Sequence, residues 1–179
     1  FALYEHVFVN CNYVEVDGPK NMNLPLNRKA FIDDIDFIFK NVILPNEHRY
    51  VTVKGRAIIF LWSVVQMEGN FASLLEEVKS KYPVFFVGSV NIMDLPDYPE
   101  FNNTLRELDG YMEYATGDVS YQKMIEGYKK GLSKLHELIE QFEEKAKRHY
   151  IVFPTFQFAF DDTKYPGRKN PSMYPIFRE

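Results

Sequence analysis

Residues 56–90 read RAIIFLWSVVQMEGNFASLLEEVKSKYPVFFVGSV, and this stretch decides the fold class. It contains an apolar run at 56–65, apolar residues at helical spacing over 70–81, and a second apolar run at 83–90. Short apolar runs bounded by turn residues indicate strands that are buried on both faces. Because a helix separates the two strands, the chain must return through a crossover, and the strands lie parallel.

The same alternation continues in both directions from this stretch. Strands are predicted at 1–9, 56–65, 83–90, 109–115 and 150–158, with a short hairpin arm at 50–53 before the Lys54-Gly55 turn. Helices are predicted from an Asn27 cap to Pro45, at 70–81, near 99–108 and at 120–149, and a polar, proline-rich tail follows the last strand. The order is βαβαβαβαβ, which predicts an α/β protein with five parallel strands and intervening helices.

Two architectures fit such strands, an open doubly wound sheet and a (β/α)₈ barrel. A dinucleotide-binding sheet carries G-x-G-x-x-G after its first strand, and here Asn-Cys-Asn-Tyr follows instead. A barrel fits better, but it normally takes eight strands and ~250 residues. We therefore expect 1–179 to be a single α/β domain and an incomplete portion of a larger (β/α)₈ barrel of the TIM type.

Composition limits the classes of partner. The net charge is −4, without a Lys/Arg stripe, so we expect no nucleic-acid partner. No apolar run is long enough to predict a membrane span. Cys11 is the single cysteine and excludes an intrachain disulfide. We expect no metal site and no cofactor, and the sequence leaves localisation open between cytoplasm and secretion.

Acidic and aromatic residues follow the predicted strands. In a barrel the chemistry lies at the C-terminal ends of strands. The candidate substrate-binding residues there are Tyr4, Glu5, Trp62, Glu113, Tyr114, Asp161, Asp162 and Arg168. Carboxylates beside aromatic rings suit sugars, which offer hydroxyls to hydrogen-bond and a C–H face that packs on rings. The alternatives stay open: a glutamate pairing with a lysine, Trp62 in the core, and Asp161-Asp162 as turn formers.

Several segments together resemble the glycoside hydrolase family 99-like proteins, which include endo-α-1,2-mannosidases and WbsX-type proteins. They are ALYEH, NRKAFIDDIDFIFKN, HRYVTVKGRAIIFLW, LDGYMEYATG and YIVFPTFQFAFDDT, and they span nearly the whole chain. The strongest segments are Tyr50 to Trp62, the Asp109-Gly110 strand and the Phe-Pro-Thr strand that leads to Asp161-Asp162-Thr163. The resemblance implies a TIM barrel of which this chain is the central to C-terminal part.

The resemblance also implies roles for individual residues. Glu5 corresponds to an acidic residue facing the sugar, Tyr114 to a tyrosine of the Asp-Gly strand, and Asp162-Thr163 to an Asp-Thr pair, with Arg168 near the family's arginine. The sequence departs from the family at Phe158-Ala159, where the family has Pro-Gly, and at Met112, where it has a tyrosine. The catalytic glutamate pair of the family is expected downstream of Glu179.

The leading hypothesis is a glycan-active protein, a glycoside hydrolase of the retaining, endo-mannosidase-like kind that acts on a polysaccharide or oligosaccharide. One alternative is a non-catalytic carbohydrate-binding or scaffold barrel. Another is an unrelated α/β enzyme that acts on a phosphorylated ligand through Glu5, Asp161 and Arg168. Apart from a carbohydrate substrate, the expected partners are the missing part of the barrel or further copies of the chain.

Overall fold

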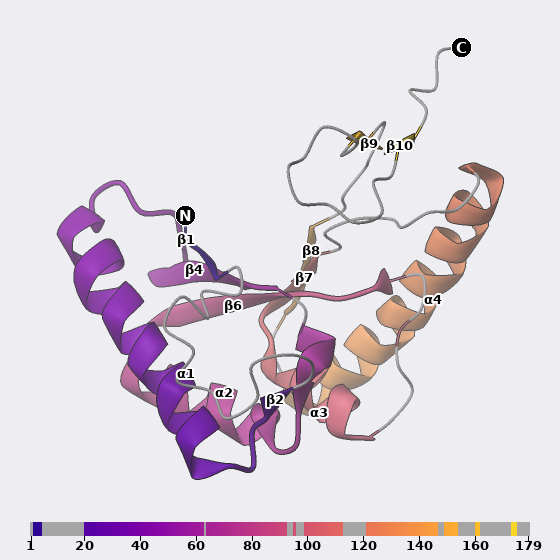
Figure 1. The fold of residues 1–179 in the computed structure, drawn as a ribbon. Helices are drawn as coiled ribbons and strands as arrows, with labels where there is room; N and C mark the ends of the chain where they lie inside the picture. Colours follow the sequence, from indigo (N-terminus) through magenta and orange to yellow (C-terminus); the bar gives the residue numbers. More distant parts are fainter. Residues whose placement is uncertain are drawn as a thin grey trace.

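The computed structural model describes residues 2–4, 20–62, 64–92, 95, 99–112, 121–146, 149–153, 160–161 and 173–174. Within these residues the chain is an α/β protein whose mixed sheet curls into half a barrel (Figure 1). The α/β prediction is confirmed. The calls for residues 5–9, 113–115 and 154–158 as strand lie outside the described residues.

Five strands of the main sheet are parallel and follow one another in chain order. They are β1 (Ala2–Tyr4), β4 (Arg56–Leu61), β6 (Val84–Ser89), β7 (Gly110–Met112) and β8 (Ile151–Phe153). The short β3 (Thr52–Val53) pairs antiparallel with β4, as the predicted hairpin arm requires. Lys54 and Gly55 in the turn both have positive φ, 50° and 75°, which suits a tight hairpin with glycine at its second position.

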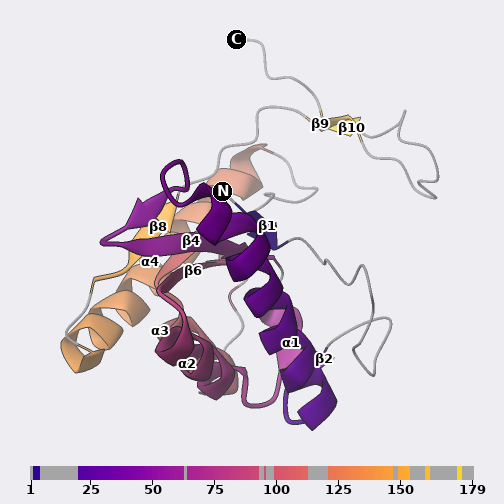
Figure 2. The same cartoon turned by 90° about the vertical axis from the view of Figure 1, so that its left-hand side faces the viewer.

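Four helices connect these strands: α1 (Pro25–Ile38), α2 (Phe71–Lys81), α3 (Pro99–Glu107) and α4 (Tyr121–Ala146). Figure 1 shows α1, α2 and α3 on one side of the sheet and α4 along its β7–β8 end, and Figure 2 shows the same arrangement from the side. This follows from the strand order, because successive right-handed crossovers in one direction place every helix on the same face. Although α4 is 26 residues long, none of the described helices is long and apolar enough to cross a membrane.

The main core lies between the helices and the sheet. Phe31 and Ile35 of α1 are fully buried against Ile59 of β4 and Phe86 of β6 in one cluster. Phe31 also meets Phe71 of α2 edge to face, with ring centroids 5.3 Å apart. Alternate residues of the sheet therefore form the apolar face against which α1 and α2 pack.

The opposite face of the sheet is also apolar. Ile58, Phe60, Phe85 and Val87 form a second buried cluster, and Val53, Met112 and Phe153 pack against it. Strand alternation explains this, because neighbours such as Ile58 and Ile59 point to opposite faces. Both faces of the central strands are thus buried, as the continuous apolar runs predict.

The predicted helix from Asn27 to Pro45 is wrong at both ends. The helix begins two residues earlier with Pro25 in its first turn, and Leu24 is the cap residue. Asn27 is instead fully buried, and its amide donates to the Asn21 carbonyl at 3.0 Å. At the other end a π-helical turn (Phe39–Ile43) and a 3₁₀ turn (Leu44–Asn46) follow. Pro45 has no N–H and cannot continue the α-helical hydrogen bonds, yet a 3₁₀ turn accommodates it.

Several short elements have no counterpart in the predictions. The strand predicted at 56–65 ends at Leu61, and a 3₁₀ turn (Val64–Gln66) and β5 (Met67–Glu68) come before α2. β5 pairs in parallel with β2 (Lys20–Asn21). In the predicted tail, β9 (Phe160–Asp161) and β10 (Met173–Tyr174) form an antiparallel pair. Strands of two residues contain too few positions for any alternation to be recognised.

Candidate functional site

The C-terminal ends of the five parallel strands meet along one edge of the sheet. The register pairs Tyr4 with Leu61, Leu61 with Gly88, Ser89 with Met112 and Met112 with Phe153. Parallel sheets place ligand sites at this edge, because the connections that follow the strands converge there. The edge therefore is the first place to look for a site.

Trp62 lies at this edge, directly after β4. The side chain is partly buried, and it belongs to neither of the two clusters of buried apolar residues. Tyr4 ends the neighbouring strand beside Leu61, so two of the predicted aromatic positions share the edge.

The other predicted site residues are only partly covered by the structure. Asp161 belongs to β9 and stands opposite Met173 in the separate two-stranded sheet. Glu113 directly follows Met112, the last residue of β7. The calls on Glu5, Glu113, Tyr114, Asp162 and Arg168 all fall outside the described residues.

At the opposite, N-terminal ends of the strands, one ion pair ties three strands together. Asp109, 2% exposed, accepts from Arg56 Nη1 at 2.7 Å and from the backbone N–H of Phe86 at 3.0 Å. The Arg56 guanidinium lies over the Phe85 ring, 4.8 Å from its centroid. The arginine begins β4, the phenylalanines lie in β6 and Asp109 precedes β7. The cluster thus lies away from the edge at which parallel sheets place ligand sites.

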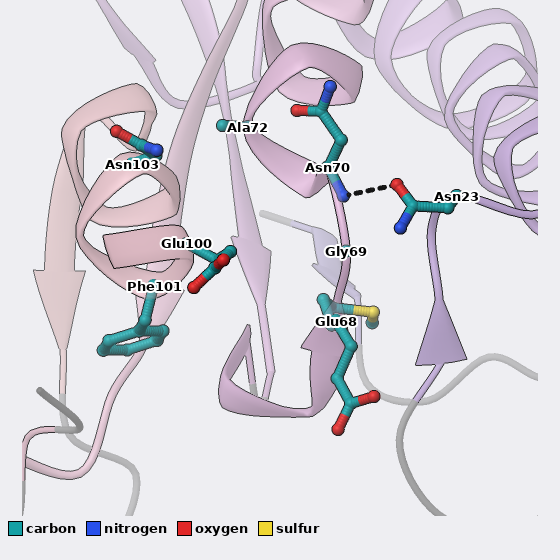
Figure 3. Close-up of a pocket in the computed structure, with 9 residues that line it drawn as sticks. Asn23, Glu68, Gly69, Asn70, Ala72, Glu100, Phe101 and Asn103 are labelled. Carbon is teal, nitrogen blue, oxygen red and sulfur yellow. Dashed lines mark hydrogen bonds between the residues drawn. The ribbon is translucent and has the colours of Figure 1, made fainter. Parts of the chain in front are cut away.

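A cavity of about 680 Å³ opens at the start of α2 and α3 (Figure 3). One wall comes from the first turns of α3, and the other from the turn between β5 and α2 together with Asn23, two residues after the end of β2. The lining residues are Asn23, Met67, Glu68, Gly69, Asn70, Ala72, Glu100, Phe101 and Asn103.

Hydrogen bonds fix one wall of this cavity. The Asn70 backbone N–H donates to Asn23 Oδ1 at 3.0 Å, and the Asn70 side chain caps α2 by accepting from the Ser73 N–H at 3.3 Å. Gly69 has a φ of 73°, and a Cβ there would lie 2.7 Å from Asn23 Nδ2. Glycine at 69 is therefore required by both the backbone conformation and the close approach of Asn23.

Arg28 of α1 holds the outer side of the same wall. It donates to the Asn70 carbonyl at 3.2 Å and to Ser73 Oγ at 3.3 Å, and it forms an ion pair with Glu77 at 3.1 Å. Hydrogen bonds from Lys81 and, to a smaller extent, from Arg28 hold the pKa of Glu77 below its usual value. The charge of Arg28 is thus neutralised by Glu77, and neither residue lines the cavity.

Three lining side chains have no partner within the described part of the chain. Glu68, Glu100 and Asn103 are exposed, and their side chains make no hydrogen bond or ion pair with any described residue. The described residues contain no group of three His, Cys, Asp or Glu side chains that could hold a metal ion. Sequence reasoning missed this cavity because its residues come from three separate segments without a motif.

Comparison with known proteins found no matching family model, no similar curated protein and no matching solved structure.

Proposed function

We propose that this chain is part of a glycan-active (β/α)₈ barrel of the glycoside hydrolase kind, acting on a polysaccharide or oligosaccharide. The observation that carries the proposal is the order of the strands. Five parallel strands follow each other in chain order, with the helices on one face and apolar side chains on the other. This is the arrangement of consecutive barrel units, and a doubly wound sheet would reverse direction at a switch point.

The chemistry of the C-terminal edge supports sugar recognition. Trp62 directly follows β4, and Glu113 directly follows β7. Aromatic rings pack on the C–H face of a sugar, while carboxylates accept its hydroxyl hydrogens. Glycoside hydrolysis needs two carboxylates in different protonation states, and the family resemblance assigns that pair to a strand downstream of Glu179.

A second candidate is carbohydrate binding without turnover. The cavity at the start of α2 and α3 favours it, because its amides and carboxylates offer hydrogen-bonding groups to a ligand. Turnover of α-mannosides by the intact protein supports the hydrolase, and saturable binding without products supports the binder.

Trp62 is the single tryptophan, which gives the binding test a local probe. Titration with mannose oligosaccharides should change its fluorescence in a saturable way. Trp62→Ala should weaken calorimetric binding by about tenfold, since stacking contributes ~0.5–1.5 kcal/mol beyond burial. Phe37→Ala is the matched control, because Phe37 lies on α1 with 63% of its surface exposed.

If no neutral glycan changes the Trp62 fluorescence, the proposal is overturned. A response to sugar phosphates alone would instead favour the enzyme for phosphorylated ligands. Equal losses of affinity in Trp62→Ala and Phe37→Ala would show that binding does not occur at the sheet edge.

A further inference from the structure

The cavity at the start of α2 and α3 lies near the C-terminal ends of the strands, as Trp62 does. The chain reaches one wall from the end of β4, through the 3₁₀ turn and β5, and the other wall from the end of β6. Both walls therefore belong to consecutive connections between a strand and the next helix. In parallel sheets, ligands bind outside the carboxyl ends of the strands, among the connections that lead to the following helices.

Size and shape suit a small ligand. A volume of about 680 Å³ falls within the ~300–1,000 Å³ typical of ligand pockets. Figure 3 shows Glu100 reaching from α3 into the space between the two walls, with Asn23 and Asn70 on the opposite side. The space is thus bordered by polar side chains that come from both walls.

The available groups are those that recognise hydroxyls. Glu68 and Glu100 are acceptors, while the Asn103 amide offers a donor and an acceptor in one plane. None of these three side chains is used by the described part of the fold. Ala72 and Met67 add apolar surface to the lining, which suits the C–H groups of a sugar ring.

The charge of the lining selects among ligands. Among the lining residues that the structure describes there are two carboxylates and no Lys, Arg or His. A phosphate brought between Glu68 and Glu100 would meet like charge on both sides, whereas a hydroxyl or an ammonium group would meet acceptors. The lining therefore favours neutral and cationic ligands over phosphorylated ones.

We infer that this cavity is a subsite for a sugar unit that carries no phosphate, and that Glu68, Glu100 and Asn103 bind its hydroxyls. The inference rests on the proposed function and extends it, since the subsite would hold a part of the glycan beyond the unit at Trp62. An amino sugar is expected to bind more tightly than the neutral sugar, because its ammonium group interacts with the two carboxylates.

The test measures binding of three probes to the full chain by calorimetry: a mannose oligosaccharide, mannosamine and mannose 6-phosphate. Glu100→Gln combined with Asn103→Ala should weaken binding of the oligosaccharide by about tenfold, as expected for two lost hydrogen bonds. Glu76→Gln is the matched control, since Glu76 is an exposed glutamate of α2 that does not line the cavity. Circular dichroism melting should be the same for all three proteins.

The outcomes separate the two proposals. Unchanged oligosaccharide affinity in the cavity variant, with loss in Trp62→Ala, overturns the subsite and leaves the proposed function standing. Binding of mannose 6-phosphate as tight as that of the neutral sugar also overturns the subsite. If neither the oligosaccharide nor mannosamine binds to the unmodified protein, both the subsite and the proposed function are refuted.

Discussion

Replacement of Asp109 by alanine should destabilise the protein, because it removes a buried acceptor of hydrogen bonds. Asp109 accepts two hydrogen bonds, from Arg56 Nη1 at 2.7 Å and from the Phe86 backbone N–H at 3.0 Å, and it is 2% exposed. A buried N–H without a partner costs ~1–3 kcal/mol. Because the Arg56 side chain is 36% exposed, water would solvate it and the lost ion pair adds only ~1 kcal/mol.

The expected loss is therefore about 2–4 kcal/mol in the free energy of unfolding. Urea denaturation, followed by both circular dichroism and Trp62 fluorescence, measures this loss if the two transitions coincide. Asp109→Asn keeps one acceptor oxygen for the Phe86 N–H but replaces the oxygen that accepts from Arg56 with an NH2 donor, so it should cost less than the alanine variant.

A double-mutant cycle separates the two contributions. Arg56→Met keeps an apolar stem over the Phe85 ring and removes the cation. The coupling between Asp109→Ala and Arg56→Met should be ~1 kcal/mol, while the remainder stays with the Phe86 amide. A loss below ~1 kcal/mol for Asp109→Ala would refute the reasoning, because neither hydrogen bond would then contribute as the burial of Asp109 implies.

Three further predictions concern single substitutions in α4, α2 and β7. Gly131→Ala should destabilise the fold by about 2 kcal/mol, although alanine normally favours a helix by ~1 kcal/mol, because the new Cβ would lie 1.7 Å from the Ile92 carbonyl oxygen; a raised melting temperature would contradict this. Glu77→Gln should be less stable than the unmodified protein at neutral pH, and this difference in stability should become smaller as pH falls. The lowered pKa of Glu77 gives stability that is present above its unfolded value of 4.5 and lost as pH falls through the folded value, so a pH-independent difference in urea midpoints would exclude the effect. Tyr111→Phe should cost about 1 kcal/mol, because the fully buried Tyr111 hydroxyl donates to the Leu105 carbonyl at 2.8 Å, and an unchanged midpoint in urea would show that this bond is dispensable.

The sequence predicted those elements whose signals are local. The helix over 70–81 has apolar residues at helical spacing and an asparagine cap, and α2 spans Phe71–Lys81. The Lys54-Gly55 turn is likewise recognisable, because a glycine between two short strands is typical of a two-residue hairpin turn. Both turn residues have positive φ in the structure. Parallel order followed from the helices between the strands, which admit no hairpins.

The parts that sequence reasoning missed depend on residues that are distant along the chain. Asn27 resembles a cap, but its amide bonds the Asn21 carbonyl, so tertiary burial overrides the local preference. The pair of Arg56 and Asp109 joins positions 53 residues apart. The cavity combines Asn23 with Glu100 and Asn103, and no periodicity connects them. Predicted site residues such as Glu5 and Asp162 remain predictions.

The Arg56 and Asp109 pair also changes what the family resemblance supports. Both residues belong to its strongest segments. Gly110, which follows Asp109 in the second of these segments, is also fixed by packing, because a Cβ at 110 would lie 2.7 Å from the Ile151 carbonyl oxygen. Packing at the N-terminal ends of the strands therefore accounts for the Arg56 and the Asp-Gly of these segments. Likeness in these segments therefore reflects packing and says little about activity. The proposed function consequently depends on the opposite edge, where Trp62 and the cavity lie, and the binding experiments are directed at that edge.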